Sequence, residues 1–549
     1  MLAGGPKRET VVKMLRRYAG AALALAAALS LASAQSNPIP QLVKRGDKFS
    51  FLVDGKPFLI LGGQVGNFSA FPDRMERAWP KLKAMNANVV EYPVYWNAIE
   101  PQEGKFDFVD FDSILRGARA QGLRVDMLWF GTWKNGAMDW TPNWVKSDPK
   151  RFPRVIDRGG SPIRVLSPHS STTLEADKKA YVTMMKHLRQ IDEADRTVIL
   201  MQVENEPGIL GSARDYSPES NKLFNGPVPE KLVSALKKKP GTWKEVFGRV
   251  AEEAFTAYYL SSYINEVTRA GKQVYPLVTY VNNWNGGYNT NDNAERWDRP
   301  GESYPSGGPV SHMLDLWKAN APDIDMLGSD TSSQASNNYR LLAAKYARPD
   351  NPHWSPEAVR GMTGARNCFY ALADFSAIGF GSFGVDGSST ALSPQFVDLG
   401  ADYRLFRAAM PAITALQQKG GLQAAVEEDP IRARHLIFDR YDVRVQFRPP
   451  SRFVPAPPPG SEPTGRVLIG ELGPDEFLVL GFDSNVEFRP GQGSEFTAAQ
   501  FLEADEGVYD ENGVWKRTDI GRTAQGDYAP PTISLPAQGA LFKVKLMRF

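Results

Sequence analysis

The sequence predicts an α/β chain in which a (β/α)8 barrel is followed by an all-β, sandwich-like domain. Between residues 59 and 381, eight short apolar runs alternate with amphipathic helical stretches, as in a closed parallel barrel. From residue 421 to the end the helical period nearly disappears and short alternating strands take over. An open, doubly wound sheet is the alternative for the first part. No glycine-rich phosphate loop follows the first strand, which argues against a nucleotide-binding version.

The N-terminal residues predict an export signal. Basic residues between Lys7 and Arg17 precede an apolar stretch, 21–32, that ends in Ala32-Ser33-Ala34. We therefore expect residues 1–34 to be removed and the mature protein to be periplasmic or secreted, with Met14 as an alternative start. Removal changes the formal net charge from +2 to about −2, which gives no basis for a nucleic-acid or anionic-membrane partner.

Residues 35–420 form the expected barrel domain, opened by a β-hairpin that turns at Asp54-Gly55. Thr172-Thr173-Leu174-Glu175 predicts a capping box at the start of a long helix. The single cysteine, Cys368, excludes an intramolecular disulfide and is expected in a helix interior. The expected strands are 59–61, 87–92, 123–130, 198–203, 274–281, 324–327, 353–358 and 377–381, and the expected helices are 74–85, 113–121, 172–190, 252–270, 312–320, 366–375 and 403–419.

Residues 421–549 form the expected all-β accessory domain, with strands at 443–447, 467–469, 476–480 and 541–546. Three roles stay open for it from the sequence: binding polysaccharide, forming a homodimer contact, or capping the barrel.

Two carboxylates at strand ends are the candidate chemistry. Glu206 follows a buried apolar run that starts at Val198 and stops in Pro207-Gly208, and Glu357 closes the seventh expected strand. Barrels place their chemistry at these strand ends, so the two side chains are expected to meet. Glycosidic bond cleavage needs such a pair, one carboxyl protonated and one ionised. The structural alternative is that either glutamate pairs with a nearby Lys or Arg, and Glu204 competes with Glu206 for the inward position.

These motifs resemble known glycosidases. Val203-Glu204-Asn205-Glu206-Pro207 resembles the Asn-Glu acid/base motif of clan A retaining glycosidases. Residues 95–104, continuing to Phe106-Asp107-Phe108, resemble the second-strand signature of the β-galactosidases of glycoside hydrolase families 35 and 42. The likeness runs from about residue 50 to 390. It is nearest to a bacterial branch of family 35 with a β-rich C-terminal domain, some of whose members trim galactose from xyloglucan side chains.

The resemblance implies roles for individual residues. Glu206 would be the acid/base, Glu357 the nucleophile, and Asn205 a partner of the sugar 2-hydroxyl, with no cofactor. This chain departs from the family at Pro93, where members have Tyr, and at the third strand, where an Asn-Ala-Glu that grips galactose is replaced. The residues at the replaced motif are Trp133, Lys134 and Asn135. The expected sugar contacts, besides Asn205, are Trp133, Asn135, Tyr280, Asn283, Trp354 and Asp386. The five histidines form no metal-binding pattern, so no catalytic metal is expected.

The expected function is an exported, exo-acting retaining β-galactosidase that removes terminal β-galactosyl residues from plant oligo- or polysaccharides such as xyloglucan. One alternative is another clan A activity, such as a β-glucanase or an α-L-arabinopyranosidase. A second is a catalytically inactive carbohydrate-binding protein in which both glutamates are structural.

Overall fold

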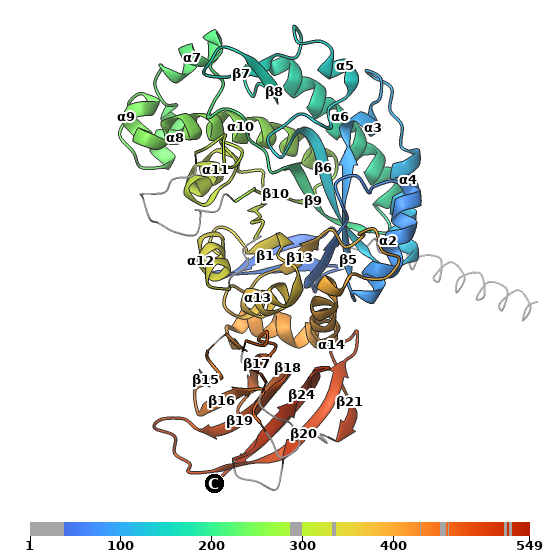
Figure 1. Ribbon diagram of the computed structural model, residues 1–549, viewed down its shortest axis with the longest axis vertical. Helices are drawn as coiled ribbons and strands as arrows, with labels where there is room; N and C mark the ends of the chain where they lie inside the picture. Colours follow the sequence, from blue (N-terminus) through green and yellow to red (C-terminus); the bar gives the residue numbers. More distant parts are fainter. Residues whose placement is uncertain are drawn as a thin grey trace, which may run out of the picture.

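The computed structural model describes residues 38–285, 299–331, 336–428, 430–450, 457–458, 460–520, 524–525 and 530–549. The expected export segment, 1–34, lies outside these residues. Figure 1 shows a barrel of strands surrounded by helices, with a separate body of strands packed beneath it.

Eight parallel strands form the barrel and confirm the predicted fold. They follow one another around the sheet in chain order, and the eighth strand pairs with the first. An open doubly wound sheet is thereby excluded. Between the sixth and seventh strands, the Ser329 amide donates to the Trp354 carbonyl over 3.0 Å and bridges the remaining seam. The strands are β4 (Ile60–Gln64), β5 (Val89–Tyr95), β6 (Arg124–Lys134), β9 (Val198–Asn205), β10 (Val278–Val281), β11 (Met326–Leu327), β12 (Trp354–Ala358) and β13 (Gly379–Phe383).

Helices cover the outside of the barrel, and their apolar faces explain why they form. In α2 (Pro72–Ala84), Met75, Ala78, Trp79 and Leu82 are buried at helical spacing, and proline at the first position suits the helix start. The other main covering helices are α4 (Val109–Ala120), α6 (Ser171–Asp192), α10 (Ala251–Val274), α11 (Leu314–Asn320), α12 (Ser336–Tyr346), α13 (Gly361–Ala373) and α14 (Val397–Lys419). Cys368 is buried within α13, as expected.

One local prediction is wrong and another is incomplete. The expected capping box at 172–175 is wrong, because the helix cap is Ser170, whose hydroxyl accepts a 3.1 Å hydrogen bond from the Thr173 amide. The predicted turn at Asp54-Gly55 is present, with φ of 53° and 75°, as two-residue hairpin turns require. The hairpin is, however, part of a three-stranded sheet of β1 (Gln41–Arg45), β2 (Lys48–Val53) and β3 (Lys56–Pro57), and β1 was not predicted.

The C-terminal region is a sandwich of two antiparallel sheets, as predicted. Along β16 (Tyr441–Phe447), side chains alternate between buried and half-buried, so one face of the strand enters the core between the sheets. The six-stranded sheet contains β14 (Leu422–Val426), β17 (Arg466–Gly473), β18 (Glu476–Phe482), β24 (Ala540–Arg548), β20 (Ala499–Tyr509) and β21 (Trp515–Ile520). The five-stranded sheet contains β15 (Ala433–Ile437), β16 (Tyr441–Phe447), β19 (Ser484–Pro490), β23 (Thr532–Leu535) and β22 (Ala524–Gln525).

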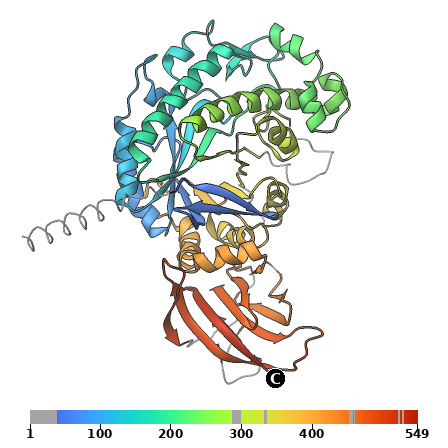
Figure 2. The same ribbon diagram turned by 180° about the vertical axis from the view of Figure 1, so that it is seen from behind.

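The sandwich packs against the barrel through α13 and α14, which lie between the two bodies in Figure 2. Leu468, Leu480 and Phe482 point out of the six-stranded sheet and join the core of the barrel. Beside them, buried Arg466 forms an ion pair with buried Asp402 of α14 at 2.7 Å. The second face of this sheet is therefore covered by the barrel helices.

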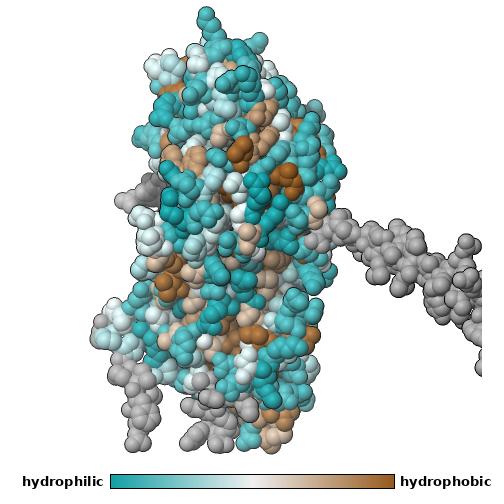
Figure 3. Space-filling model, turned by 90° about the vertical axis from the view of Figure 1, so that its right-hand side faces the viewer, coloured by the Kyte–Doolittle hydropathy of each residue, from teal (hydrophilic) through white to brown (hydrophobic). Residues whose placement is uncertain are grey.

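The face of the molecule in Figure 3 is mostly hydrophilic, with hydrophobic residues in small groups. Among the residues that the structure describes, no helix combines the length and the apolar character needed to cross a bilayer.

Candidate active site

Three carboxylates meet at one rim of the barrel. Glu206 follows β9, Asp330 follows β11 and Glu357 lies in β12. One carboxylate oxygen of each lies within 4.8 Å of those of the other two. The carboxyl ends of parallel strands share this rim, which explains how residues so distant in sequence converge. The structure thus brings together the two glutamates that the sequence singled out and adds an aspartate.

The backbone fixes Glu206 on both sides. Its amide donates a 2.8 Å hydrogen bond to Asn282 Oδ1, and its carbonyl accepts one of 3.2 Å from the Gly136 amide. Its φ of 44° lies in the left-handed region, which non-glycine residues rarely adopt. Such a conformation persists where surrounding contacts determine it, and it is common at active sites.

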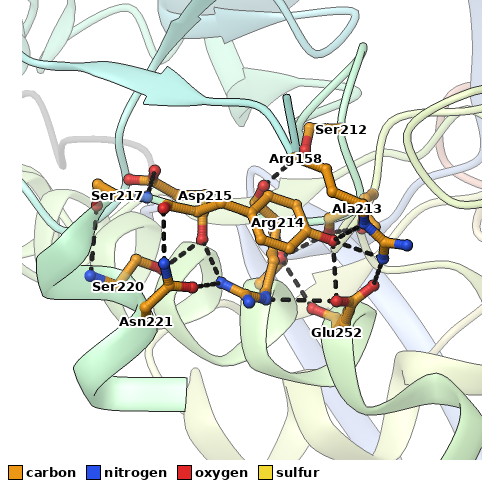
Figure 4. Close-up of polar contacts among 12 residues, drawn as sticks. Arg158, Ser212, Ala213, Arg214, Asp215, Ser217, Ser220, Asn221 and Glu252 are labelled. Carbon is orange, nitrogen blue, oxygen red and sulfur yellow. Dashed lines mark hydrogen bonds and ion pairs between the residues drawn. The ribbon is translucent and has the colours of Figure 1, made fainter. Parts of the chain in front are cut away.

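A buried arginine holds the segment that follows Glu206 (Figure 4). Arg214 donates to the Asp215 carbonyl over 2.7 Å and to Asn221 Oδ1 over 2.8 Å, and it lies 3.5 Å from Glu252 of α10. Its guanidinium also lies 3.8 Å from the centre of the Tyr216 ring. These contacts tie the loop after β9 to α7 (Pro218–Phe224) and α10, so the polypeptide leaving the site is anchored.

Glu357 is oriented by two side-chain amides. Gln64 Nε2, at the end of β4, donates to Glu357 Oε1 over 2.9 Å. Asn205 Nδ2 approaches the same oxygen at 3.5 Å. Two donors on one oxygen fix the carboxylate plane, as a nucleophile at a defined position requires.

Glu206 is able to hold a proton near neutral pH. Burial raises the pKa of Glu206 to about 7, the neighbouring Glu357 carboxylate adds to the rise, and Lys134 and Asp330 oppose it. A carboxyl with this pKa is a competent general acid at neutral pH. The environment of Glu206 therefore suits the acid/base role.

Glu204 has a structural environment. It is fully buried, and its carboxylate accepts hydrogen bonds from the amides of Thr132 at 3.0 Å and Trp133 at 2.8 Å. Burial and then Asp177 raise its pKa well above the ordinary value. These bonds join the ends of β6 and β9, whereas Glu206 faces the other carboxylates. The geometry favours Glu206 over Glu204 as the reacting group.

Four of the expected sugar contacts lie at the rim. Asn205 and Asn283 are buried, and each has a side-chain oxygen without a hydrogen-bond partner among the described residues. Asn135 is half-buried, and its amide donates to the Asn205 carbonyl over 3.1 Å. Asp386 lies in the loop after β13 and accepts a 2.7 Å hydrogen bond from the Gly66 amide. Their role in sugar binding stays a prediction.

Three other expected contacts are core residues, and their assignment to the sugar needs correction. Trp133 is fully buried, packs edge-on against Tyr263 of α10, and donates to the Leu166 carbonyl. Tyr280 is fully buried and donates to Asp126 Oδ2 over 2.7 Å. Trp354 is fully buried at the start of β12 and packs edge-on against Tyr280. None of the three presents a surface to the rim.

Four residues at the site were not predicted from the sequence to act there. Gln64, Asn282 and Asp330 each close or follow a barrel strand, so the rule that identified Glu206 could have found them. Lys134 was assigned only as a departure from the family motif. It is buried and donates to Asn135 Oδ1. Its positive charge lowers the pKa of Glu206 and of Asp330.

Two more acids lie inside the barrel beneath the rim. Glu91 of β5 and Asp126 of β6 are partners in the strand register and are fully buried. Burial raises the pKa of both groups well above the ordinary value, and for Glu91 the charges of Asp126 and Glu357 add to the effect. Gly62 and Gly381 leave room for the Glu91 carboxyl, because a Cβ at either would lie within 2.3 Å of its Oε1.

Comparison with known proteins finds a glycosidase family over part of the chain. Residues 50–303 match the family Glycosyl hydrolases family 35, and residues 399–527 match a Domain of unknown function (DUF5597). The match is to family 35, so the family 42 part of the expected resemblance was a slip. Glu206 lies within the matched residues and Glu357 lies beyond them.

Curated relatives are similar over part of the chain. A β-galactosidase of Xanthomonas manihotis is 28% identical over 214 residues, covering 37% of this chain and 32% of the relative. Human β-galactosidase-1-like protein 3 is 29% identical over 192 residues, covering 34% of this chain and 27% of the relative. An exo-β-D-glucosaminidase of Pyrococcus horikoshii is 30% identical over 175 residues, covering 29% of this chain and 22% of the relative. The chain thus spans about a third or less of the length of these relatives.

Proposed function

We propose that this chain, whose residues 50–303 carry a glycosyl hydrolases family 35 domain, is an exported, exo-acting retaining β-galactosidase. Its substrates would be terminal β-galactosyl residues of plant oligo- or polysaccharides such as xyloglucan. The observation that carries the proposal is the approach of the Glu206 and Glu357 carboxylates to within 4.8 Å of each other at the barrel rim.

The spacing supports retention of configuration. Retaining glycosidases hold their two carboxyl groups roughly 5–5.5 Å apart, whereas inverting enzymes leave about 6.5–9.5 Å for a water molecule. One oxygen of Glu206 and one of Glu357 lie within 4.8 Å of each other, a separation nearer to the retaining range than to the inverting one. A direct attack by one carboxylate on the sugar is therefore the favoured route.

In the first step Glu357 attacks the anomeric carbon while the bond to the leaving oxygen breaks. Glu206 gives its proton to that oxygen, so the leaving group departs as an alcohol. Gln64 and Asn205 hold Glu357 in line for the attack through their hydrogen bonds to Oε1. A covalent glycosyl-enzyme results.

In the second step water replaces the leaving group. Glu206, now ionised, takes a proton from the water, whose oxygen attacks the anomeric carbon and releases Glu357. Glu206 ends the cycle protonated, and no cofactor enters the balance. Its pKa of about 7 suits both halves of this exchange.

Galactose specificity rests on the relatives rather than on the site. Of the relatives compared above, one is named as a β-galactosidase, one as a β-galactosidase-1-like protein and one as an exo-β-D-glucosaminidase. The third strand of this chain ends in Trp133, Lys134 and Asn135, unlike the galactose-gripping motif of the family. A β-glucanase or α-L-arabinopyranosidase activity on the same scaffold is thus the second candidate.

A panel of aryl glycosides tests the specificity. We expect nitrophenyl β-galactoside to give the highest kcat/KM, at least about tenfold above the β-glucoside and the α-L-arabinopyranoside. A preference for either of these would replace galactose in the proposal but leave the mechanism intact. Release of galactose from xyloglucan oligosaccharides, followed by chromatography, tests the exo-acting mode on the polymer.

Nucleophile rescue tests the mechanism. Glu357→Ala should lose nearly all turnover, and azide should restore part of it by occupying the space of the missing carboxylate and forming a glycosyl azide. Near-normal activity of this variant would refute the assignment. Binding of galactosides by the wild type without any turnover would instead favour an inactive carbohydrate-binding protein.

A further inference from the structure

Asp330 occupies a position at the reacting centre that the two-carboxylate mechanism does not use. It follows β11, its side chain is 5% exposed, and one of its oxygens lies within 4.8 Å of an oxygen of Glu206 and of Glu357. A third buried acid at this distance would place three negative charges together if all were ionised. Such an arrangement is costly, so at least one of the acids must keep a proton.

Asn282 determines how Asp330 faces Glu206. Its Oδ1 accepts from the Glu206 amide, and its Nδ2 donates to Asp330 Oδ2, each over 2.8 Å. One fully buried side chain therefore spans both residues and fixes their separation. Because Oδ2 accepts a hydrogen bond, Oδ1 is the oxygen left to carry a proton. Oδ1 is itself buried and has no hydrogen-bond partner within the usual limit among the described residues.

The charges around Asp330 come from several elements. Glu206, directly after β9, and Glu357 of β12 are its acidic neighbours, and Lys134 of β6 is the opposing cation. Tyr346 of α12 is a neutral neighbour whose own pKa is raised by burial and then by Asp330. Burial, followed by the two glutamates, raises the pKa of Asp330 well above the ordinary value, and Lys134 offsets part of the rise.

We propose that Asp330 is a positioning residue that stays protonated at the working pH and donates a hydrogen bond to Glu206 as that carboxyl group ionises. This inference rests on the proposed function. While Glu206 transfers its proton to the leaving oxygen, Asp330 keeps its own, and its hydroxyl stabilises the carboxylate that forms. During the second step Glu206 takes a proton from water, and the same hydrogen bond weakens again. Asp330 neither gains nor loses a proton over the cycle.

Two substitutions separate this role from that of an ionised acid. In Asp330→Asn the carbonyl oxygen can still accept from Asn282, so the amide N–H₂ faces Glu206 as a permanent neutral donor. In Asp330→Leu the donor is lost. Hydrogen bonds to charged groups contribute roughly 1.5–3 kcal/mol, so we expect kcat/KM to fall about 10- to 100-fold in the leucine variant and only about threefold in the asparagine variant.

The pH profile gives a second readout. The alkaline limb of kcat/KM should move to higher pH in Asp330→Leu, because the carboxylate of Glu206 loses its donor, and should stay nearly in place in Asp330→Asn. If Asp330 were ionised, removal of its charge would move the limb to lower pH in both variants. That outcome, or equal loss of activity in the two variants, would overturn the proposal.

A spectroscopic measurement needs no turnover. We expect the infrared carbonyl band of protonated carboxyl groups in the wild type to weaken in Asp330→Asn, with matching thermal melting of both proteins. An unchanged band would show that Asp330 is ionised and overturn the proposal. Since this comparison does not depend on the substrate, it distinguishes failure of this inference from failure of the proposed function, which the azide experiment tests.

Discussion

Gln64 Nε2 donates a 2.9 Å hydrogen bond to Glu357 Oε1, joining the first strand of the barrel to the seventh. In the sheet only β13 lies between β4 and β12. The contact therefore exists only because the eighth strand returns to pair with the first. Closure of the barrel and orientation of the proposed nucleophile depend on the same pairing.

We expect Gln64→Leu to lower kcat/KM by about tenfold, since a neutral donor to a charged acceptor is worth roughly 1.5–3 kcal/mol and Asn205 partly compensates. Formation of the glycosyl-enzyme, followed as the burst of aryl alcohol, should slow. Gln423→Leu is the matched control, because it removes a 2.7 Å glutamine hydrogen bond in the accessory domain. Equal effects of both variants would show that Gln64 acts only on stability.

The alkaline limb of kcat/KM should report Glu206. Its pKa of about 7 means that the proton required for the first step is present below this pH and is lost above it. Activity on nitrophenyl galactoside, measured from about pH 5 to about pH 9, should therefore fall tenfold per pH unit on the alkaline side. In Glu206→Ala, assayed with dinitrophenyl galactoside, whose departure needs no proton, the limb should disappear. A limb that persists in this variant would assign it to another group.

The barrel and the meeting of two acids were predictable from sequence because both depend on local patterns. Apolar runs ending in polar residues mark strands, and Glu206 and Glu357 each occur at such an end. The rest of the site depends on which way each side chain points. Trp133 and Glu204 lie on the side of their strands that faces the surrounding core, while Lys134 and Glu206 reach the rim. The spacing of residues in the sequence does not show which of these side chains faces the core and which reaches the rim.

Asp330 was hidden for a different reason. The expected strand at 324–327 is present as the short β11, Met326–Leu327, but Asp330 lies three residues beyond its last residue, whereas Glu206 directly follows β9. The positive φ of Glu206 and of Glu204 also cannot be predicted from the residue type, because it results from contacts with neighbouring strands. Helix α12 was missed since its apolar periodicity is weak.

Glu204→Gln should destabilise the protein while sparing the chemistry. The amides of Thr132 and Trp133 need two acceptor oxygens, and a glutamine offers one. An unsatisfied buried donor costs about 1–3 kcal/mol, which urea denaturation should detect. The kcat of the folded variant should stay within about threefold of wild type, whereas Glu206→Gln should lose at least about a thousandfold on nitrophenyl galactoside. The reverse pattern would exchange the roles of the two residues.

Chelation should not affect activity. The oxygens of Glu206, Asp330 and Glu357 are close enough to share a cation, yet the proposed mechanism uses them as acids and as a nucleophile. Dialysis against EDTA should leave kcat/KM unchanged within error. A loss that Mg²⁺ or Ca²⁺ restores would make the cluster a metal site and would also refute a protonated Asp330.

The ion pair between Arg466 and Asp402 should be essential for holding the accessory domain on the barrel. The two charged groups are buried and 2.7 Å apart, and the guanidinium lies 3.9 Å from the centre of the Phe482 ring. Arg466→Met leaves Asp402 buried without its partner, which typically costs 3–5 kcal/mol. Replacing both residues, as Arg466→Met with Asp402→Leu, removes the isolated charge, so most of the loss in unfolding free energy should be recovered. Urea denaturation of the two variants measures this difference. A single variant that loses less than about 1 kcal/mol would show that apolar packing of Leu468, Leu480 and Phe482 holds the interface by itself.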